Sequence, residues 1–419
     1  MTNRVSRIST LLVLSVMFAI DHKPLAVSAA RIQVAQAEWP DWRGPKRDGC
    51  STDSGLLKRW PQGGPRMVWK ATGIGHGYST VVISGGRIFT TGTIDDQISI
   101  FAFDMAGKPV WNVTHGPDYT QDHPGARATP VVDAGRLYVM SGIGRVGCYS
   151  VKDGSKLWTR EMSELGGEIP GWGYTETPLV YNDLLVVTPG GRTAIVALNK
   201  TTGATVWKSS GFSAGAQYSS AIAAIHLGVP MIINGTDRGI VAVSPQDGSL
   251  LWKNDFSSGN TANVPTPAYS DGYVFWANGY GRGGICLKLS ESGGKVTATE
   301  AWRTSRMDCH VGGFIVRNGY IYGNHGGGWN CLDVKTGEVK WSQRGVGKGE
   351  ICYADGMLYL FSERGGVAGL GPASPEGFDL TGQFSVEGRG ESWAYPVVAG
   401  GRLYLRYDEN LYCFDVKAV

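Results

Sequence analysis

The 419-residue chain lacks a charge imbalance, a long apolar run and helical periodicity, and each absence excludes a class of protein. With 39 basic and 36 acidic side chains the formal net charge is only +3, so nothing favours a nucleic acid partner, which normally requires a basic surplus. The apolar run at 11–20 is too short to cross a bilayer as a helix, and no later run is long enough. Almost no segment repeats its apolar residues at helical spacing, which argues against an all-α fold.

The first 37 residues have the order of a secretory signal peptide. Arg4 and Arg7 precede the apolar run, and a stretch of small residues ends at Ala37. This order of basic, apolar and cleavable segments is typical of exported proteins. We therefore expect a signal peptide at 1–37, cleaved after Ala37 or after Ala29 or Ala30, and a periplasmic or secreted mature protein. An uncleaved membrane anchor is the alternative interpretation.

One motif recurs along the chain. In residues 331–341 a strand is followed by a tight turn at Thr336-Gly337 and by a second strand that carries Trp341. Copies at 148–158, 197–207 and 242–252 keep the same offsets of a small residue, a glycine and a tryptophan, and the copy at 102–111 is one residue shorter. Self-similarity of this kind indicates a repeat architecture. The 62 glycines and 19 prolines, which follow no collagen period, supply turns between short strands.

The repeat predicts a closed ring. Each unit adds three strands to a tryptophan-bearing one, as in the Thr-Pro openings of 129–139 and 266–275, and eight such openings can be counted. The last unit, 394–416, has no fourth strand after it, whereas the strand at 67–70 precedes the first unit. Because a ring leaves no free sheet edge, we predict an all-β fold, an eight-bladed β-propeller of four-stranded antiparallel blades, closed by 67–70 pairing with the last blade. The expected segments are the signal peptide at 1–37, an irregular lead-in at 38–65 that wraps a surface, and the propeller at 66–419.

Tryptophan and cysteine occupy fixed places in the repeat. Half of the 14 tryptophans fall on predicted fourth strands, and Phe384 takes this place in the last copy, so we expect these rings to pack between blades. Four of the seven cysteines occupy a position where other copies carry alanine, which indicates buried free thiols in a crowded strand. These four are Cys148, Cys286, Cys331 and Cys413, while Cys50, Cys309 and Cys352 cannot be paired from the sequence.

At these repeats the chain resembles the PQQ-like β-propeller repeat family, whose pattern is Ala-x-Asp-x-x-Thr-Gly-x-x-x-Trp. The resemblance covers 66–416, and the lead-in at 39–45 is also similar to that of a group of secreted bacterial proteins. The family includes quinone-dependent dehydrogenases and propellers that bind no quinone, such as the assembly factor BamB. The resemblance therefore implies the fold and leaves both functions open.

The enzymes of this family imply a cofactor site with recognisable residues. Many of them cradle the quinone with a disulfide between adjacent cysteines and hold calcium with carboxylate and amide groups. This chain has no adjacent cysteines and no Cys-x-x-Cys-His haem attachment motif. We therefore expect no cofactor and no metal, with PQQ and calcium as the alternative.

Candidate site residues come from the loops that lead into each innermost strand. In a propeller these loops crowd one mouth of the central channel, and two of them, 114–127 and 161–176, are long. Charged and aromatic side chains converge there, as expected of a pocket for a polar ligand. The candidates are His76, Tyr78, Arg127, Tyr174, Glu176, Tyr218, Asn263, His310, Lys348, Glu350, Glu391 and Trp393.

Two functions follow from this mouth. The preferred one is an exported binding or assembly module that recognises a polar small molecule, a saccharide or a protein. The alternative is a PQQ- and calcium-dependent alcohol or sugar dehydrogenase with its quinone at the same mouth. A silent funnel, stabilised by pairs of Arg127 with Glu176 or of Lys348 with Glu350, is a third interpretation. Catalytic residues cannot be assigned from the sequence, because general acid or base work depends on distances.

Overall fold

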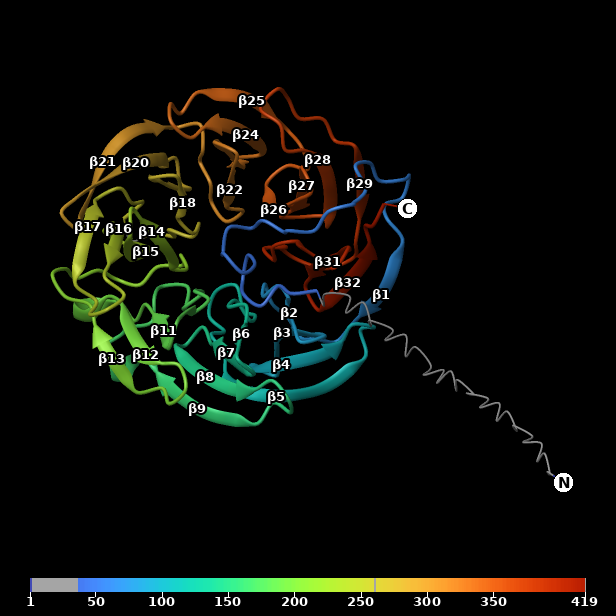
Figure 1. Ribbon diagram of the computed structural model, residues 1–419, viewed down its shortest axis with the longest axis horizontal. Coiled ribbons are helices and arrows are strands. Elements are labelled where there is room, and N and C mark those ends of the chain that lie inside the picture. Colours follow the sequence, from blue (N-terminus) through green and yellow to red (C-terminus); the bar gives the residue numbers. More distant parts are fainter. Residues whose placement is uncertain (2–36, 260, 419) are drawn as a thin grey trace. The chain divides into compact units, whose positions relative to one another are not determined.

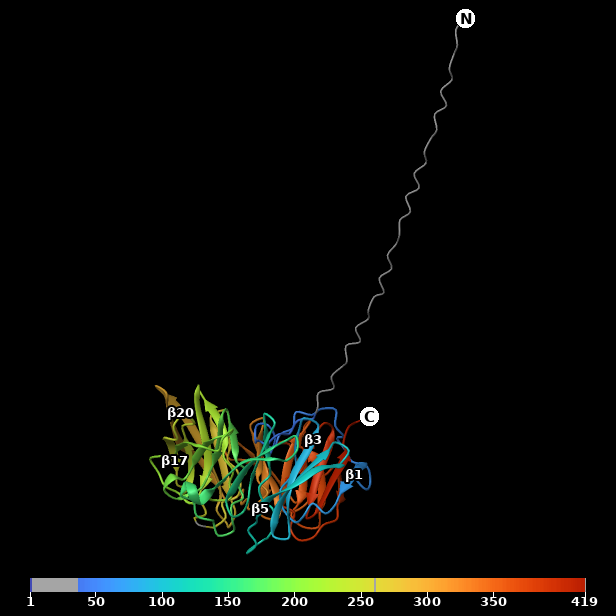
Figure 2. The same ribbon diagram turned by 90° about the horizontal axis from the view of Figure 1, so that it is seen from below.

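The computed structural model describes residues 1, 37–259 and 261–418, so the predicted signal peptide lies outside the described residues except at its two ends. From residue 37 onward, eight sheets of four strands each stand around a common axis (Figure 1). Figure 2 shows the same sheets from the side of the ring. Each strand pairs antiparallel with its neighbours, so the predicted all-β, eight-bladed propeller is confirmed.

The blades follow one another along the chain, and the first strand of each blade lies innermost (Figure 1). The first blade consists of β2 (Val82–Ser84), β3 (Arg87–Ile94), β4 (Gln97–Asp104) and β5 (Pro109–Pro117), and the second of β6 (Val131–Asp133), β7 (Arg136–Met140), β8 (Arg145–Ser150) and β9 (Lys156–Glu161). The third blade consists of β10 (Leu179–Tyr181), β11 (Leu184–Val187), β12 (Val196–Asn199) and β13 (Thr205–Lys208). The fourth consists of β14 (Ile222–His226), β15 (Val229–Thr236), β16 (Gly239–Val243) and β17 (Leu250–Asn254). The next three are β18 (Ala268–Ser270), β19 (Tyr273–Asn278), β20 (Gly283–Ser292), β21 (Lys295–Thr304); β22 (Phe314–Arg317), β23 (Tyr320–His325), β24 (Gly328–Asp333), β25 (Val339–Gln343); and β26 (Gly349–Ala354), β27 (Met357–Ser362), β28 (Val367–Pro372), β29 (Gly382–Ser385). The last blade is β30 (Val397–Ala399), β31 (Arg402–Tyr407), β32 (Asn410–Asp415) and β1 (Met67–Ala71), and two short 3-10 helices are η1 (Met162–Leu165) and η2 (Gly191–Thr193).

The ring closes as the sequence predicts. Strand β1 pairs antiparallel with β32, with Trp69 opposite Cys413 and Lys70 opposite Tyr412. The earliest strand of the propeller therefore completes the last sheet, and no open blade edge is left between the two ends of the array.

Turn chemistry and the tryptophans explain why each blade docks on the next. The Asp333 Oδ1 atom accepts the backbone N–H groups of Lys335 and Thr336 at 2.8 and 2.9 Å, which fixes the hairpin turn. Gly337 then adopts a φ of 74°, and a Cβ atom there would lie 2.7 Å from the Trp302 ring of the preceding blade. The Trp302 indole N–H donates to the Val334 carbonyl at 2.9 Å, so one ring both packs against and bonds to the next blade.

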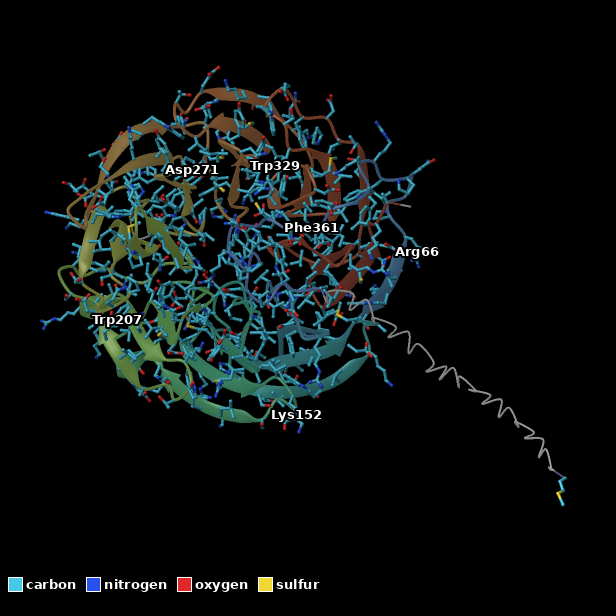
Figure 3. The ribbon with its side chains drawn as sticks, in the orientation of Figure 1. Arg66, Lys152, Trp207, Asp271, Trp329 and Phe361 are labelled. Atoms are coloured by element: carbon cyan, nitrogen blue, oxygen red, sulfur yellow. The ribbon has the colours of Figure 1, made fainter. Side chains whose placement is uncertain are left out.

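The same arrangement joins other blades, so the predicted packing of tryptophans between blades is confirmed at these copies. Trp207, on the outer strand of its blade (Figure 3), donates its indole N–H to the Pro245 carbonyl of the next blade at 3.0 Å. Trp69, Trp111, Trp158 and Trp341 make equivalent bonds. Trp252 is different, because its N–H points to the Met231 sulfur of its own blade at 3.3 Å.

The Thr-Pro openings link the blades at the inner edge. Hydroxyl groups of one opening accept the backbone N–H of the opening before it: Thr80 to Thr129 at 3.0 Å, Thr177 to Ser220 at 3.0 Å, and Ser220 to Thr266 at 3.2 Å. Since these groups are buried and otherwise unable to reach water, the bonds satisfy polar atoms around the channel. The recurrence of Thr and Ser at the openings is therefore structural.

The lead-in enters the central channel and does not merely wrap a surface as expected. Figure 1 shows this segment in blue inside the ring. Arg43 donates to the Phe314 carbonyl of β22, while Arg47 donates to the carbonyls of Ala221 and Thr177 at 2.8 and 2.6 Å. Residues 39–50, which we call the plug, are thus bonded to innermost strands of several blades. Prolines and glycines leave the segment without regular structure, and two buried guanidinium groups hold it in place.

All seven cysteines are free and buried, which confirms the prediction for the four repeat positions and shows that Cys50, Cys309 and Cys352 form no disulfide. Burial raises the pKa of the Cys148 and Cys286 thiols to about 12, so both stay protonated and unreactive at neutral pH. Within the described part of the chain, no helix has the length and apolar character needed to cross a membrane.

Candidate functional site

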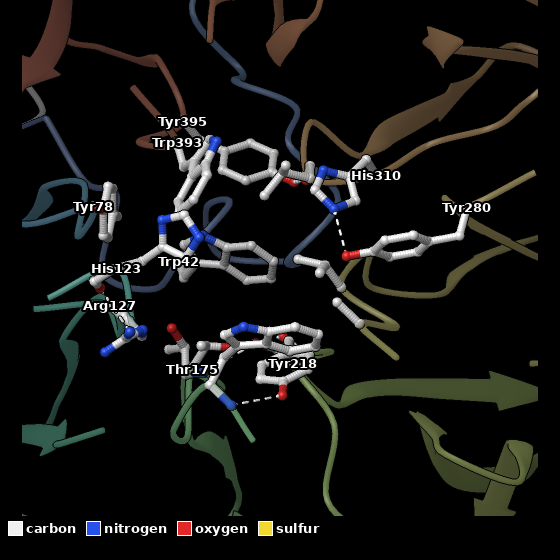
Figure 4. A pocket seen from close by; sticks show the side chains of 16 residues that line it. Trp42, Tyr78, His123, Arg127, Thr175, Tyr218, Tyr280, His310, Trp393 and Tyr395 are labelled. Carbon is white, nitrogen blue, oxygen red and sulfur yellow. Dashed lines mark hydrogen bonds between the residues drawn. The ribbon is translucent and has the colours of Figure 1, made fainter. Parts of the chain in front are cut away.

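A cavity of about 220 Å³ lies at the mouth of the channel, and its wall is mostly aromatic (Figure 4). Smaller residues complete the wall, and none of the lining residues is an aspartate or a glutamate. The rings that line it are Trp42, Tyr78, Trp172, Tyr218, Tyr280, Trp393 and Tyr395, together with His123, His310 and the guanidinium group of Arg127.

These side chains come from several loops and from the plug. The loop between β5 and β6 supplies His123 and Arg127, and the loop between η1 and β10 supplies Trp172. The segments before the innermost strands β14 and β30 supply Tyr218 and Trp393. Since all innermost strands begin on the same side of the ring, their leading loops converge on one mouth.

Neighbouring rings in the wall are not parallel. The Tyr78 and Trp393 rings lie 4.7 Å apart between centroids at 36°, and the His123 and Trp393 rings 5.0 Å apart at 60°. Trp172 and Tyr218 meet at 55°. The plug contributes Trp42, whose ring stands at 81° to that of Tyr395. The neighbouring rings therefore form a curved aromatic surface.

Arg127 is the cation of the wall that has no carboxylate as a hydrogen-bond partner within the described residues. Its Nη2 atom donates to the carbonyls of Asp122 and His123 at 2.5 and 2.7 Å, and its guanidinium lies 5.0 Å from the centre of the Tyr119 ring. Burial lowers the pKa of Arg127, while Asp118 nearby opposes that shift. Asp118 is itself hydrogen-bonded by Thr93 at 2.6 Å. The guanidinium charge is thus available to a ligand.

A chain of hydrogen bonds crosses the opposite side of the mouth. Lys348 Nζ lies 2.6 Å from Glu363 Oε1 and 2.9 Å from His310 Nδ1, and His310 Nε2 lies 2.9 Å from the Tyr280 hydroxyl. Burial, and then the charge of Lys348, lowers the pKa of His310, so this ring is neutral at pH 7. Although burial opposes it, bonds from Lys348 and Trp393 lower the pKa of Glu363, which is therefore ionised.

Two buried carboxyl groups lie outside the cavity wall. Burial raises the pKa of Glu176 to about 7, although the Thr188 backbone N–H donates to it and Arg47 lies near. Burial also raises the pKa of Glu350 well above its ordinary value, although Lys348 and the Tyr395 hydroxyl group oppose this shift. At neutral pH Glu350 is therefore protonated, and neither group offers the cavity a permanent negative charge.

The structure brings together part of the predicted site. Tyr78, Arg127, Tyr218, His310 and Trp393 line the cavity. Lys348 supports it from behind through its bond to His310.

The remaining candidates have partners elsewhere. His76 bonds to Asp408, Glu391 pairs with Arg364 at 2.7 Å, and Tyr174 donates to the Glu168 carbonyl at 2.8 Å. Asn263 bonds to Gln217 at 3.0 Å. Together with the buried Glu176 and Glu350, these side chains do not line the cavity.

The ion pairs suggested for a silent funnel do not form. Lys348 pairs with Glu363 and not with Glu350, and Arg127 bonds to backbone carbonyls and not to Glu176. The reason is geometric, because Glu350 and Glu176 are fully enclosed, whereas Glu363 lies within reach of the lysine.

Sequence reasoning missed several lining residues. Trp42 belongs to the plug, and its place in the mouth depends on the bonds of Arg43 and Arg47. Tyr280 follows β19 and does not precede an innermost strand. Three further residues lie in or next to loops that the sequence predicts at the mouth, so their aromatic or imidazole side chains could have identified them. These are His123, Trp172 and Tyr395.

The lining residues do not fit a calcium-held quinone. Calcium in proteins takes six to eight oxygen ligands, with carboxylates prominent among them. The cavity wall contains no carboxylate, and the described residues contain no cluster of three or more His, Cys, Asp or Glu side chains that could hold a metal ion.

The chain is similar to known proteins in sequence and in fold. Over 222 residues the chain is 27% identical to the quinoprotein alcohol dehydrogenase PedH of Pseudomonas putida, a match that covers 49% of this chain and 33% of that protein. The chain thus matches about a third of the length of that curated relative.

Two solved structures share the fold at 13% identity, too low to indicate more than fold. BamB from Moraxella catarrhalis superimposes with a TM-score of 0.63, covering 84% of this chain and 98% of the other. The quinohemoprotein alcohol dehydrogenase from Comamonas testosteroni superimposes with a TM-score of 0.67, covering 91% and 80%.

A family model agrees with these likenesses. It is described as outer membrane protein assembly factor BamB and matches residues 96–343, more than half of the chain. The repeat motif, the eight blades and this match agree, and the chain belongs to that family of PQQ-like propellers.

Proposed function

We propose that this propeller is a binding module that captures a polar ligand in the cavity at its channel mouth. The observation that carries the proposal is the cavity itself, in which aromatic rings from separate loops surround a guanidinium group that has no carboxylate partner. Concave sites with aromatic walls and a few placed polar groups are the usual form of small-molecule sites. The plug supports this function because it is bonded to separate blades inside the ring and contributes Trp42 to the wall.

Ligand capture can be followed by the fluorescence of the cavity tryptophans. We expect a screen of polar small molecules against the purified protein to yield a saturable change that Trp172→Ala and Trp393→Ala abolish. Trp111→Ala is the matched control, since this ring lies on the outer strand β5 and its loss lowers stability without touching the cavity. Equal binding by all three variants would place the ligand elsewhere and reject the proposal.

The rival function, a PQQ- and calcium-dependent dehydrogenase, is tested on the same protein. Because the wall has no carboxylate for calcium, we expect no saturable uptake of PQQ and no dye reduction with alcohols or sugars when both are added. Uptake of one quinone per chain with turnover would replace the binding module by the enzyme.

Export to the periplasm or the medium is part of the proposal. It rests on the basic, apolar and small-residue order of 1–37. A fusion of these residues to a reporter that is active only after export is expected to give activity, and Leu11→Arg within the apolar run is expected to abolish it. Activity that survives this substitution would argue against a signal peptide.

A further inference from the structure

Among the described residues that line the cavity, Arg127 carries the permanent charge, while Asp118 lies nearby outside the lining. Arg127 has only backbone carbonyls as hydrogen-bond partners in the described structure, and the second cation near the mouth, Lys348, is neutralised by Glu363 at 2.6 Å. No lining residue is acidic. A ligand that complements this wall brings its own anion, and a carboxylate matches the planar guanidinium best.

The hydrogen-bond chain from Lys348 through His310 fixes the direction in which the Tyr280 hydroxyl group donates. An ammonium group can only donate, so His310 Nδ1 accepts from Lys348 and the ring proton sits on Nε2. That proton is donated to the Tyr280 oxygen at 2.9 Å. The hydroxyl proton of Tyr280 therefore points away from His310. Because the Tyr280 side chain lines the cavity and is 56% exposed, this O–H can donate to a bound ligand.

The two donors lie on opposite sides of the cavity, with Trp42 and Tyr218 between them (Figure 4). Neighbouring rings of this wall meet at 36° to 84°, so adjacent rings do not lie flush against one flat aromatic ligand. A thick, puckered ring fits such a surface better, because its C–H groups can lie against several ring faces of negative potential at once.

We propose that the cavity binds a sugar acid, a pyranose ring whose carboxylate pairs with Arg127 and whose hydroxyl or ring oxygen accepts from Tyr280. This inference rests on the proposed binding function and specifies its ligand class. His310 and Lys348 are positioning residues in this arrangement, because they act through Tyr280.

Calorimetric titration with galacturonate and trigalacturonate tests the proposal, with galactose as the neutral match and benzoate as the flat acid. We expect galacturonate to bind roughly tenfold or more tighter than galactose, as a charge-assisted pair implies. Arg127→Gln removes that preference and Arg127→Lys keeps part of it. Tyr280→Phe weakens the acid and the neutral sugar alike. Two variants outside the cavity lining, Arg59→Gln and Tyr273→Phe, serve as controls and bind as the wild type does.

Several results would overturn the sugar acid. Equal affinity for galactose and galacturonate, tighter binding of benzoate, or an unchanged preference in Arg127→Gln each contradict it. If another compound binds and Trp393→Ala abolishes that binding, the ligand class is wrong and the binding function stands. If no compound binds at the cavity, both are rejected.

Discussion

At the residue scale, the unusual groups are the carboxyls enclosed around the plug. Asp41 lies 3.3 Å from Arg47, and burial nevertheless raises the pKa of Asp41 to about 6. Glu176, also close to Arg47, has a pKa of about 7 for the same reason. Removing an ionised carboxylate from water costs more free energy than the attraction of one nearby guanidinium group recovers. Asp41 and Glu176 therefore keep their protons at a pH where exposed carboxyl groups are ionised.

Glu176 makes the stability of the protein depend on pH in a defined direction. Its folded pKa of about 7 lies above its usual 4.5, so between these values the folded state binds a proton that the unfolded state has released. The free energy of unfolding therefore falls as pH rises from 4.5 to 7, and the loss stays above pH 7. Glu176→Gln removes this contribution, because a neutral amide can still accept the Thr188 N–H.

Denaturant unfolding at pH 5 and pH 7.5 measures the effect. We expect the wild type to lose on the order of 2 kcal/mol relative to Glu176→Gln across this interval, from the size of the pKa shift. Part of the dependence remains in the variant because Asp41 also titrates. Parallel curves for the two proteins would show that Glu176 does not carry the shift.

At the element scale, the hairpins of six blades are held by the tryptophan of the blade before them. Trp207 is buried, packs against Gly248 of the next hairpin, and donates to the Pro245 carbonyl at 3.0 Å. Trp207→Ala removes the ring and leaves that carbonyl without its donor. We expect a loss of about 3–5 kcal/mol in the free energy of unfolding. Leu157→Ala, at an exposed position on β9, is the control and costs little. Coincident unfolding curves for Trp207→Ala and the wild type would contradict the role.

How much the sequence predicts differs between elements for a physical reason. The hairpins and the ring closure were predictable, because a small residue, a glycine and a tryptophan recur at fixed offsets and two incomplete sheets remained. Trp42 was not predictable, because no repeat contains it and its position depends on Arg43 and Arg47 bonding to strands far along the chain. Lys348 lies near the mouth, bonded to His310, but its pairing with Glu363 and not with Glu350 depends on burial that the sequence does not display.

At the scale of the whole molecule, Arg406 joins the two ends of the ring. This β31 side chain is 1% exposed and donates to the carbonyls of Ser79 and Gly75 at 2.9 and 3.0 Å, both at the entry to the first blade. Burial lowers the pKa of Arg406 to about 9, which leaves it charged at neutral pH.

Arg406→Met leaves these carbonyls without donors in a dry environment. We expect a loss on the order of 3–5 kcal/mol and earlier exchange of the amide hydrogens of β1 and β32 than of the middle blades. Arg364→Met is the control, since this arginine is exposed and its pair with Glu391 contributes at most about 1 kcal/mol. If Arg406→Met is as stable as Arg364→Met, the β1–β32 pairing closes the ring without this side chain.

The plug contributes Trp42 to the cavity wall, and a substitution of Arg47 tests whether the plug shapes the cavity. Arg47→Met removes the donor to the carbonyls of Thr177 and Ala221 and deprives Asp41 of its partner, which we expect to cost about 3–5 kcal/mol if the buried pair is broken cleanly. Its neighbour Lys46 is exposed, so Lys46→Met matches the substitution without the contacts. In hydrogen exchange, residues 39–50 of the Arg47 variant should lose protection while the blade strands keep theirs, because the blades are held by their own hydrogen-bond ladders and tryptophans.

Ligand capture should weaken in the same variant, since Trp42 then leaves the wall. Exchange and capture equal to those of Lys46→Met would mean that the plug is fixed by Arg43 alone and that its second arginine has no part in shaping the cavity.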